Sequence, residues 1–529
     1  MSRITGIHLV EVELSAKQIN LNCNKQNFKI VSMRKSFKNV FFSFLILIGF
    51  SELSIAQAKP EFDLVLSGGR VIDPETKLDA IRNVGIRDHK IVAISVAPLK
   101  GRETIDVSGL VVAPGFIDLH VHGITNKEQE YQMHDGVTTA LELEWGMGAI
   151  AKWYQSMQSK SLINYGASVC WPFERSQAIK AYQIDKNSRA NGFHLISATA
   201  DSINEFLKPT FYQSLNDEQI QQTLKNIQSA LAEGGIGIGV PIGYLPGAKV
   251  EEVYRIYELA GKIKALIFTH VRDIGMASVQ QAISDAMLTG APLHIVHINS
   301  MSLSEIKIGI EMVQTAKQKG FDISTELYPY TASSTNLGSA LFDEGWQKKM
   351  GITYGDLQWV ATGERLSKET FEAYRKTGGI VIIHLMKPEW IRTGIASKGT
   401  MIASDGMPYA PLAHPRTAGT FTRVLGKYAR EEKVIDLSTA IEKMTLLPAR
   451  RLEIIAPIMR KKGRIQVGAD ADITIFNAAT VTDKASFEKG LAFSEGIEYV
   501  IVNGSVILKN GKTVNHIFPG QPIYGKFKN

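Results

Sequence analysis

The sequence predicts a (β/α)₈ TIM-like barrel with a small β-sandwich domain built from both ends of the chain. Between Pro114 and about Ile455, apolar runs of strand length alternate with longer amphipathic stretches, which is the pattern of βα units in a parallel barrel. There are eight such runs, the number that a closed barrel requires. They end near His120, Glu144, Cys170, Pro241, His270, His297, Tyr330 and Asp405.

Short β-type runs separated by turn signals flank the predicted barrel on both sides. Residues 59–113 hold the first set, and residues 456–529 hold the second, which includes a turn at Asn503-Gly504. We therefore expect these two segments to be the halves of one small sandwich, around a barrel of residues 114–455. The interval Leu337–Gly379 lacks a clear pattern, which favours a lid or an insertion.

Residues 1–58 have the features of the leader of an exported protein. Met33-Arg34-Lys35 gives a basic start, Val40–Phe50 is apolar, and Ala56-Gln57-Ala58 resembles a signal-peptide cleavage site. A membrane anchor needs about 18 or more apolar residues, and this run is shorter than that. We therefore expect a signal peptide starting at Met33, and a periplasmic or secreted protein without a stable membrane anchor.

The charge of the chain does not favour a nucleic-acid-binding protein, and its cysteine content does not favour a disulfide-stabilised one. The formal charge is +7, but residues 1–58 hold 7 Lys and Arg against 3 Asp and Glu, which leaves +3 for the rest. This near balance gives no reason to expect a nucleic-acid partner. Only Cys23 and Cys170 are present, so cleavage after Ala58 would leave one thiol and no intrachain disulfide.

Four histidines stand at the carboxyl ends of predicted strands. His120 and His122 lie one residue apart within Pro114–Gly123, so their side chains point to one side of a strand and both can reach one metal. His270 and His297 each end an apolar run, at the face of a barrel where functional groups lie. One such histidine is more often structural than a ligand, but four in this arrangement favour a metal site.

Asp405 ends the last predicted strand, in Met401–Gly406. A carboxylate at this position can bind a metal and accept the proton of an attacking water. Imidazole and carboxylate ligands without a thiolate cluster suit zinc, and nickel, cobalt, manganese and iron occupy similar sites. The sequence therefore predicts a centre for Zn²⁺, with one or two ions per chain.

This set of residues resembles the amidohydrolase superfamily, the relatives of dihydroorotase and urease, and the resemblance covers nearly all of residues 61–529. Within it, the chain is most similar to the N-acyl-D-amino-acid deacylase family, which includes D-aminoacylases and D-glutamate deacylases. The matching motifs are Gly237–Gly247, Thr269-His270-Val271-Arg272, Ser404-Asp405-Gly406, His414-Pro415-Arg416, Gly419–Gly426, Lys443-Met444-Thr445 and Leu447-Pro448-Ala449-Arg450.

The resemblance implies an activity and a set of metal ligands. It implies that the chain hydrolyses a linear amide, the one in an N-acyl amino acid, to a carboxylate and a free amino acid. The D-configuration of that amino acid rests on the family alone. By the same resemblance, His270 and His297 would hold the tighter zinc and His120 and His122 the weaker one. Asp405 would be the catalytic general base and a metal ligand.

Three further residues are expected to bind the substrate. Arg416 would hold its carboxylate, because a planar guanidinium donates two hydrogen bonds to such a group. Tyr244 and Tyr330 resemble residues that line the family's substrate site, where a phenol donates to a carboxylate or a carbonyl. The family commonly has a lysine two residues after its last single histidine, whereas this chain has Asn299 there.

The strand that follows Gly136–Thr139 departs from the family. Members usually have a metal-bridging cysteine there, whereas this chain continues with Glu142 and Glu144. Both glutamates fall on one face of the strand, where burial is costly unless a cation compensates. Because Glu144 lies nearest the carboxyl end, we expect it to bridge the metals. Glu142 is the alternative bridging ligand. Both glutamates could instead hydrogen-bond to the metal ligands without binding the metal themselves. Cys170 could supply a thiolate in their place.

Two rival functions stay open at this point. A cyclic-amide hydrolase or a dipeptidase of the same superfamily would use the same metals, although Gly235–Gly243 lacks the lysine that many members carbamylate. A non-catalytic periplasmic binding protein would keep the barrel but has no reason to keep the metal ligands. We therefore expect a zinc-dependent enzyme whose partner is a small N-acyl amino acid, and the sequence leaves its oligomeric state open.

Overall fold

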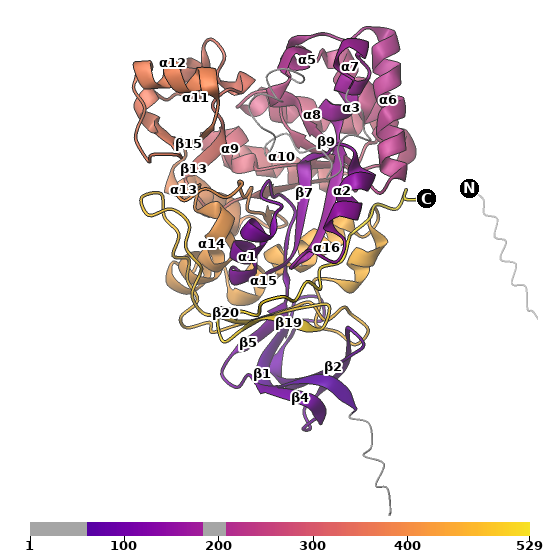
Figure 1. The fold of residues 1–529 in the computed structure, drawn as a ribbon, viewed down its shortest axis with the longest axis vertical. Helices are drawn as coiled ribbons and strands as arrows, with labels where there is room; N and C mark the ends of the chain where they lie inside the picture. Colours follow the sequence, from indigo (N-terminus) through magenta and orange to yellow (C-terminus); the bar gives the residue numbers. More distant parts are fainter. Residues whose placement is uncertain (1–60, 184–207) are drawn as a thin grey trace, which may run out of the picture. The chain divides into compact units, whose positions relative to one another are not determined.

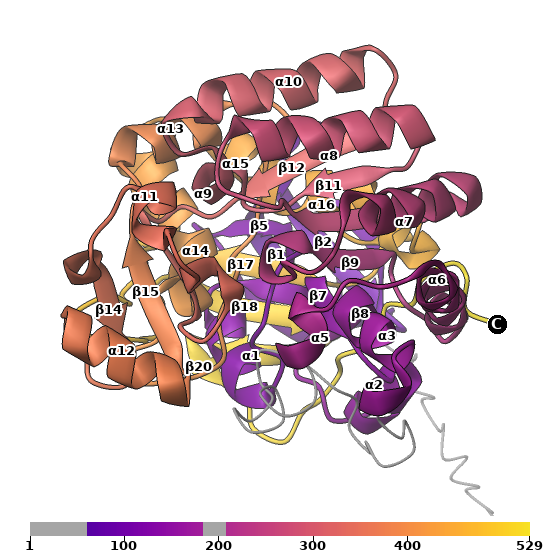
Figure 2. The same ribbon diagram turned by 90° about the horizontal axis from the view of Figure 1, so that it is seen from above.

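Eight parallel strands form the barrel (Figures 1 and 2). The structure is a computed structural model that describes residues 61–183 and 208–529, so the predicted leader lies outside the described residues. Val121, just beyond β6, forms a parallel bridge with Gly406, just beyond β16, so the barrel is nearly closed. In hydrogen-bonded order the strands are β6 (Phe116–Asp118), β7 (Val137–Met147), β8 (Asn164–Cys170), β9 (Ile238–Pro241), β10 (Ile267–His270), β11 (Leu293–Ile295), β12 (Ile323–Leu327) and β16 (Met401–Ile402).

The barrel confirms the fold class expected from the apolar runs. Every strand ends within three residues of the position where its run was expected to end. The residues of these strands are buried throughout, for example all of β7 and all of β10. Parallel strands covered by helices are buried on both faces, which explains why they appear in the sequence as nearly continuous apolar runs.

Helices surround the barrel and connect successive strands (Figure 2). Thr125 and Asn216 are the N-cap residues of α1 and α6, and each forms a capping box. In a capping box the side chain of the N-cap residue bonds the backbone N–H three residues later, and the side chain of that later residue bonds the N-cap backbone N–H. None of the described helices has the length and apolar character needed to cross a membrane. The helices around the barrel are α1 (Asn126–His134), α2 (Ile150–Met157), α3 (Trp171–Gln177), α5 (Lys208–Tyr212), α6 (Asp217–Ala232), α7 (Val250–Ile263), α8 (Met276–Thr289), α9 (Ile298–Ser302), α10 (Ile306–Gln318), α13 (Pro388–Ala396), α14 (Arg416–Arg423), α15 (Leu437–Met444) and α16 (Leu446–Leu452).

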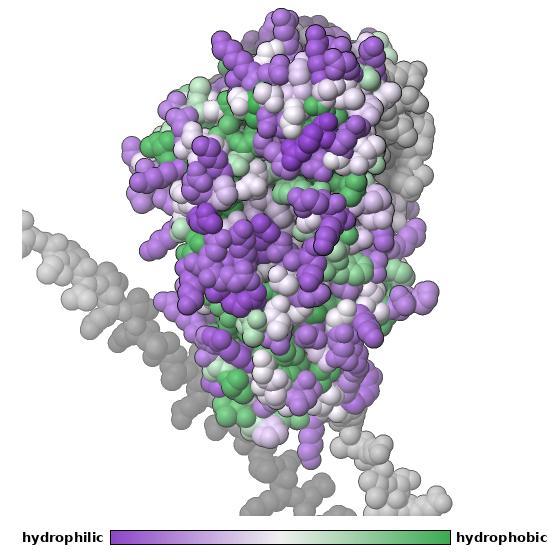
Figure 3. All heavy atoms as spheres, turned by 90° about the vertical axis from the view of Figure 1, so that its left-hand side faces the viewer, coloured by the Kyte–Doolittle hydropathy of each residue, from purple (hydrophilic) through white to green (hydrophobic). Residues whose placement is uncertain are grey.

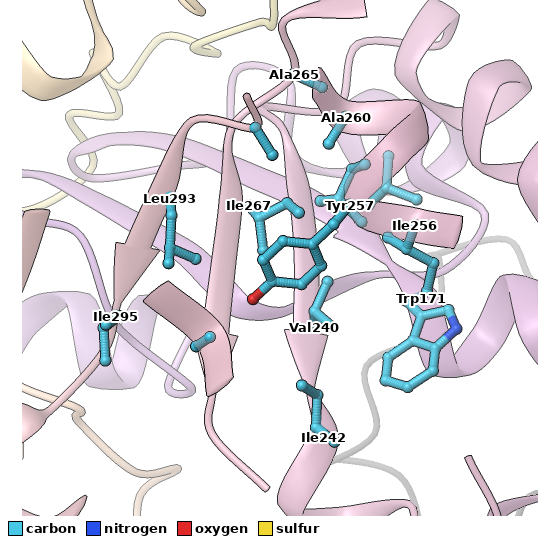
Figure 4. Packing of buried hydrophobic residues seen from close by; sticks show 14 of the residues in the cluster. Trp171, Val240, Ile242, Ile256, Tyr257, Ala260, Ala265, Ile267, Leu293 and Ile295 are labelled. Atoms are coloured by element: carbon cyan, nitrogen blue, oxygen red, sulfur yellow. The ribbon is translucent and has the colours of Figure 1, made fainter. Parts of the chain in front are cut away.

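Apolar side chains fill the space between the barrel wall and the outer helices. On one side, Val240, Ile267 and Leu293 of neighbouring strands pack in one cluster with Ile256 and Tyr257 of α7, and all five are fully buried (Figure 4). Burying a side chain of this size stabilises the fold by about 1.5–3 kcal/mol. This layer fixes the strands whose carboxyl ends carry the predicted metal ligands.

A nine-stranded sheet is built from the two ends of the described chain. Its central pairing is antiparallel, between β5 from the amino-terminal part and β17 from the carboxyl-terminal part, with Val112 opposite Ile475. The expectation of a separate β-domain formed from both chain ends is therefore confirmed. Its strands are β1 (Phe62–Asp73), β2 (Leu78–Arg87), β3 (Lys90–Ser95), β4 (Gly101–Asp106), β5 (Val111–Pro114), β17 (Ile473–Phe476), β18 (Ile497–Val502), β19 (Ser505–Lys509) and β20 (Lys512–Thr513).

A buried ionic network ties this sheet to the barrel. Lys462 Nζ lies 2.5 Å from Asp472 Oδ2 and 3.1 Å from Asp470 Oδ2, and all three side chains are almost fully buried. Asp472 also accepts hydrogen bonds from the side chain of Asn164, at the start of β8, and from the backbone of Asn503 in the sheet. Asp470 also pairs with the partly exposed Lys90, whereas the described ion pair of Asp472 is with Lys462.

Replacing Lys462 by methionine is expected to lower the free energy of unfolding by about 3–5 kcal/mol, because it leaves the buried carboxylate of Asp472 without its cation. Urea denaturation of the purified protein measures this change. The matched control is Lys509→Met, which removes an exposed pair with Glu103 at 3.0 Å and is expected to cost about 0–1 kcal/mol. Equal losses in the two variants would contradict the role given to the network.

The interval Leu337–Gly379, which lacks a clear sequence pattern, lies within a larger insertion that has its own sheet and whose first and last strands flank the interval. Strands β13 (Ala332–Asn336), β14 (Leu357–Trp359) and β15 (Ile380–His384) form it in the order β13-β15-β14, with α11 (Trp346–Met350) and α12 (Lys368–Thr377) beside them. Figure 1 places this unit to one side of the barrel, across from α5 and α7. His384 bonds Gln358 Oε1 at 3.0 Å and packs on Phe487, so its ring is part of the packing of this unit.

The surface is polar with scattered apolar residues. Figure 3 shows the side of the molecule that carries the insertion, where hydrophilic residues predominate and hydrophobic ones form small separate groups. Large exposed hydrophobic residues such as Val96, Leu288 and Val467 lie far apart in the chain. Single exposed apolar residues are normal on a folded protein and do not by themselves indicate a partner.

Candidate metal centre

The four predicted histidines converge on the carboxylate of Glu144. Its Oε2 lies 3.2 Å from the Nε2 atoms of both His120 and His122. Its Oε1 lies 2.9 Å from His270 Nδ1 and 3.2 Å from His297 Nε2. One carboxylate oxygen therefore faces each histidine pair, and all five side chains are buried.

A break in the regular pairing of β7 accompanies the placement of Glu144. The register between β7 and β8 shifts between Glu142 and Met147, which marks a bulge. Within it Gly146 has φ +72°, and a Cβ atom there would lie 2.4 Å from the carbonyl oxygen of Ser168. Bulges next to functional sites redirect side chains, and here the bulge directs Glu144 to the centre.

Glu142, the fallback for the bridge, lies on the outer side of His122. Its Oε2 is 2.8 Å from His122 Nδ1, the ring nitrogen opposite the one that faces Glu144. Its Oε1 accepts hydrogen bonds from the backbone N–H groups of Trp145 and Gly146. Both glutamates thus lie around His122, as their shared face predicts, but only Glu144 faces both histidine pairs.

Two buried carboxylates at the centre escaped the sequence analysis. Glu326, on β12, lies 2.6 Å from His120 Nδ1 and 3.3 Å from His294 Nε2. Asp118 accepts hydrogen bonds from the backbone N–H groups of His120 and Ser404, on the two sides of the barrel seam. A charged residue inside an apolar run was the signal used for the β7 glutamates, and it would have found both.

Asp405 lies beside the first histidine pair. Its Oδ1 is 3.2 Å from His122 Nε2, 3.6 Å from His120 Nε2 and 2.8 Å from Arg416 Nη2. Burial alone would raise the pKa of this carboxyl, but Arg416 and the nearby histidines hold the pKa below its usual value. Asp405 is therefore ionised at neutral pH and able to accept a proton.

The donor set fits divalent cations such as zinc. Groups of three ligand atoms within 4.8 Å of one another are His120, His122 and Glu144, then Glu144, His270 and His297, and also His120, His297 and Asp405. Five carboxyl groups are buried here, and the guanidinium of Arg416 pairs with one of them, Asp405; the five are those of Asp118, Glu142, Glu144, Glu326 and Asp405. Burial of so much negative charge is costly unless cations compensate for it, and nitrogen and oxygen ligands suit zinc.

The negative charge of the centre also changes the pKa values of the side chains within it. Burial disfavours a charged imidazole, but the carboxylates of Asp405 and Glu326 outweigh it and raise the pKa of His120 to about 10. Burial likewise disfavours ionised Glu326, yet His120 and His294 lower its pKa to about 2. The anions that hold a proton on an imidazole of the metal-free centre would equally attract a metal cation.

A cavity opens from the centre toward the insertion. His122, Glu144, His297, Asp405 and Tyr244 line it together with residues of β13, α5 and α12. Tyr244 bonds Thr335 through its phenol at 3.1 Å and packs against the His270 ring. The expectation that Tyr244 lines the site therefore agrees with its position, and the insertion supplies the facing wall through Ser334, Thr335 and Asn336.

Arg416, Tyr330 and Cys170 lie outside this lining. Arg416 is fully buried behind Asp405 and Ser334, and its Nε and Nη1 atoms have no hydrogen-bond partner. Tyr330 differs from expectation, because its ring is buried against Arg423 and His414. Cys170 is buried in an apolar cluster, burial raises the pKa of its thiol, and it belongs to none of the described ligand groups.

Asn299 stands where the family commonly has a lysine. It donates a hydrogen bond to the carbonyl oxygen of Tyr328 at 3.2 Å, within a fully buried environment. Its side chain therefore supports the backbone at the end of β12. In this part of the described site, Arg416 is the cation that lies next to Asp405.

The chain is similar to known proteins in its sequence and in its fold. A family model described as the amidohydrolase family matches residues 391–508. D-aminoacylase from Alcaligenes xylosoxydans xylosoxydans is 29% identical over 482 residues, which cover 86% of this chain and 96% of that protein. A solved N-acyl-D-glutamate deacylase from Bordetella bronchiseptica, complexed with zinc and a phosphonate inhibitor, is 24% identical with a TM-score of 0.72, over 88% of this chain and 99% of that one.

A second solved structure, a D-aminoacylase described as having a binuclear metal centre, matches with 24% identity and a TM-score of 0.72 over 88% of this chain and 100% of that one. At this level of identity the solved structures show the fold, and they agree with the barrel and its separate sheet. Together with the curated relative, they support the family that the sequence motifs indicated. The chain is similar to amidohydrolases, and the deacylases of N-acyl-D-amino acids are among them.

Proposed function

We propose that the protein is a metal-dependent hydrolase that cleaves the amide bond of N-acyl amino acids to a carboxylate and a free amino acid. The observation that carries the proposal is the convergence of two histidine pairs on the two oxygens of Glu144, with Asp405 beside them. Zinc is the proposed metal, at two sites that share Glu144. The similarity to D-aminoacylase and to a zinc-containing N-acyl-D-glutamate deacylase supports zinc and a D-amino acid.

The bound metal would supply a Lewis acid, which lowers the pKa of water and polarises a carbonyl group. Asp405 would accept the proton of the attacking water, because its carboxylate is ionised and lines the cavity. The same carboxyl group would then give its proton to the leaving amine. Tyr244 is placed to donate a hydrogen bond to the substrate from the cavity wall, once Thr335 releases its phenol.

Arg416 lies directly behind Asp405 and Ser334 of the cavity wall, and its unpaired Nε and Nη1 atoms would bind the carboxylate of a substrate that reaches past them. Arg416→Lys is expected to lower kcat/KM by about 10–100-fold, mainly through KM, because lysine keeps the charge but loses the paired hydrogen bonds of the guanidinium. Steady-state kinetics with an N-acetyl-D-amino acid measure the effect. The control is Arg423→Lys, in a neighbouring arginine that pairs with Asp483 and not with Asp405. An unchanged KM in Arg416→Lys would remove Arg416 from the substrate site.

Hydrolysis by the purified, zinc-loaded protein tests the proposal itself. We expect it to release amino acid from N-acetyl-D-amino acids, and not from their L-enantiomers, from dipeptides or from cyclic amides such as dihydroorotate. Turnover of a cyclic amide or a dipeptide alone would move the function to another amidohydrolase reaction. Absence of turnover on all of these substrates, in protein that holds metal, would overturn the proposal.

We also propose that the protein acts in the periplasm or outside the cell, without a membrane anchor. Support comes from the basic start at Met33, the apolar run and the small-residue motif before Lys59, all of which lie outside the described residues. Cell fractionation with sequencing of the mature amino terminus tests this. A mature chain that begins near Lys59 in the periplasm or medium is expected, and a cytoplasmic chain with an intact amino terminus would contradict it.

A further inference from the structure

The two histidine pairs of the centre differ in what lies behind them. On the side away from Glu144, His120 Nδ1 lies 2.6 Å from Glu326 Oε1 and His122 Nδ1 lies 2.8 Å from Glu142 Oε2. His270 instead turns its Nδ1 to Glu144, and the Nδ1 of His297 has no partner among the described residues. Only the first pair therefore has a carboxylate behind each ring in the described part of the chain.

Glu326 is held in place by a second histidine. Its Oε2 lies 3.3 Å from His294 Nε2, while His294 Nδ1 lies 2.8 Å from the hydroxyl of Ser324. The carboxylate and both imidazoles are buried. This arrangement fixes the carboxylate of Glu326 so that it accepts the Nδ1–H of His120, which leaves Nε2 as the ring nitrogen directed at the centre.

Glu142 is held by the backbone of the β7 bulge. Its Oε1 accepts the N–H groups of Trp145 at 3.1 Å and Gly146 at 3.4 Å, which leaves Oε2 for His122 Nδ1. The orientation of this carboxylate is therefore set by the same bulge that directs Glu144 inward. A proton on His122 Nδ1 again leaves Nε2 as the atom that faces the centre.

We propose that Glu142 and Glu326 are positioning residues that make the His120–His122 side the tighter of two divalent-cation sites. A carboxylate behind a ligating imidazole fixes its tautomer and its orientation and makes the ligand nitrogen more basic. Asp405 adds a third carboxylate on this side, at 3.2 Å from His122 Nε2 and 3.6 Å from His120 Nε2. The inference rests on the metal centre of the proposed function, and it reverses the order of affinities that the family resemblance implies.

The order is tested by titrating metal-free protein with Zn²⁺ in competition with a chromophoric chelator. The unaltered protein is expected to show two binding steps. His122→Ala is expected to remove the tighter step and leave the weaker one, and His270→Ala is expected to remove the weaker step. Loss of the tighter step in His270→Ala, with retention in His122→Ala, would overturn the proposed order.

Glutamine substitutions test the two positioning residues, and the structure predicts unequal effects. In Glu142→Gln the backbone N–H groups hold the amide oxygen, so the amide NH₂ turns to His122 Nδ1 and forces its proton onto Nε2, where the metal should bind. In Glu326→Gln the amide oxygen can still face His120 while NH₂ faces His294. We expect Glu142→Gln to weaken the tighter step by about 100-fold and Glu326→Gln by about 10-fold, with the weaker step unchanged.

Glu252→Gln is the matched control, because it removes a buried carboxylate that pairs with Arg175 at 2.8 Å, away from the centre. Neither zinc step is expected to change in it. An unchanged tighter step in Glu142→Gln, or an equal loss in Glu252→Gln, would overturn the positioning role. Ordered zinc binding without amide hydrolysis would overturn the proposed deacylase and leave this inference standing, whereas a protein that binds no zinc would overturn both.

Discussion

Replacing Glu144 by glutamine is expected to leave at most one zinc ion per chain and to lower deacylase activity by at least about 100-fold. Substitutions outside the ligand set typically cost about 10–100-fold, and Glu144 faces both histidine pairs directly. An amide offers one oxygen acceptor where the carboxylate offers two, so it can serve only one of the pairs. Elemental analysis and steady-state kinetics on the same preparation measure the two effects.

Glu252→Gln again serves as the control for loss of a buried carboxylate, and it is expected to keep both zinc ions and full activity. Circular dichroism of the two variants shows whether each is folded. A Glu144→Gln protein that retains two zinc ions and full turnover would show that Glu144 does not bridge the centre. Glu142 already has its oxygens directed to His122 and to the backbone of the bulge, so it does not substitute for Glu144.

Asp405→Asn is expected to reduce kcat by about 10²–10⁴-fold while zinc content stays close to that of the unaltered protein. Asparagine keeps the shape of the side chain and an oxygen for Arg416, but it cannot accept the proton of the attacking water. Arg416 lies 2.8 Å from Asp405 Oδ1 and favours the ionised form of this base. Kinetics at saturating substrate, with metal analysis, measure the change.

Asp483→Asn is the matched control, because Asp483 pairs with Arg423 at 2.7 Å much as Asp405 pairs with Arg416. Asp483 lies outside the cavity lining, so kcat is expected to be unchanged. Full kcat in Asp405→Asn would exclude Asp405 as the base. If zinc and activity were lost in parallel, the result would show that Asp405 binds the metal. It would then give no separate evidence that Asp405 transfers a proton.

The barrel and the ligand positions could be predicted because their determinants are local. Each strand is a buried apolar run, and each expected ligand stands at the carboxyl end of such a run, as at His270 in β10. The parallel arrangement brings those ends to one face, so that residues as far apart as Glu144 and His297 meet at 3.2 Å. The pattern of apolar residues and the order of the strands along the chain are therefore sufficient to predict the barrel and the positions of its ligands.

The remaining features depend on contacts between distant strands. Glu326 meets His120 across the barrel, a pairing set by strand register that no local pattern contains. The choice between Glu142 and Glu144 depends on the bulge at Gly146, where a Cβ atom would collide with the carbonyl oxygen of Ser168 on the neighbouring strand. Tyr330 follows a strand end like the ligands, but its ring packs on Arg423 from α14, so its position depends on helix packing.

Anomalous diffraction from crystals of the zinc-loaded protein tests the central claim most directly. We expect two zinc peaks that flank Glu144, each about 2.0–2.2 Å from one of its carboxylate oxygens, with His120 and His122 on one ion and His270 and His297 on the other. A single peak, or two peaks with Glu144 turned away from both, would contradict the shared carboxylate and the two-site centre built on it.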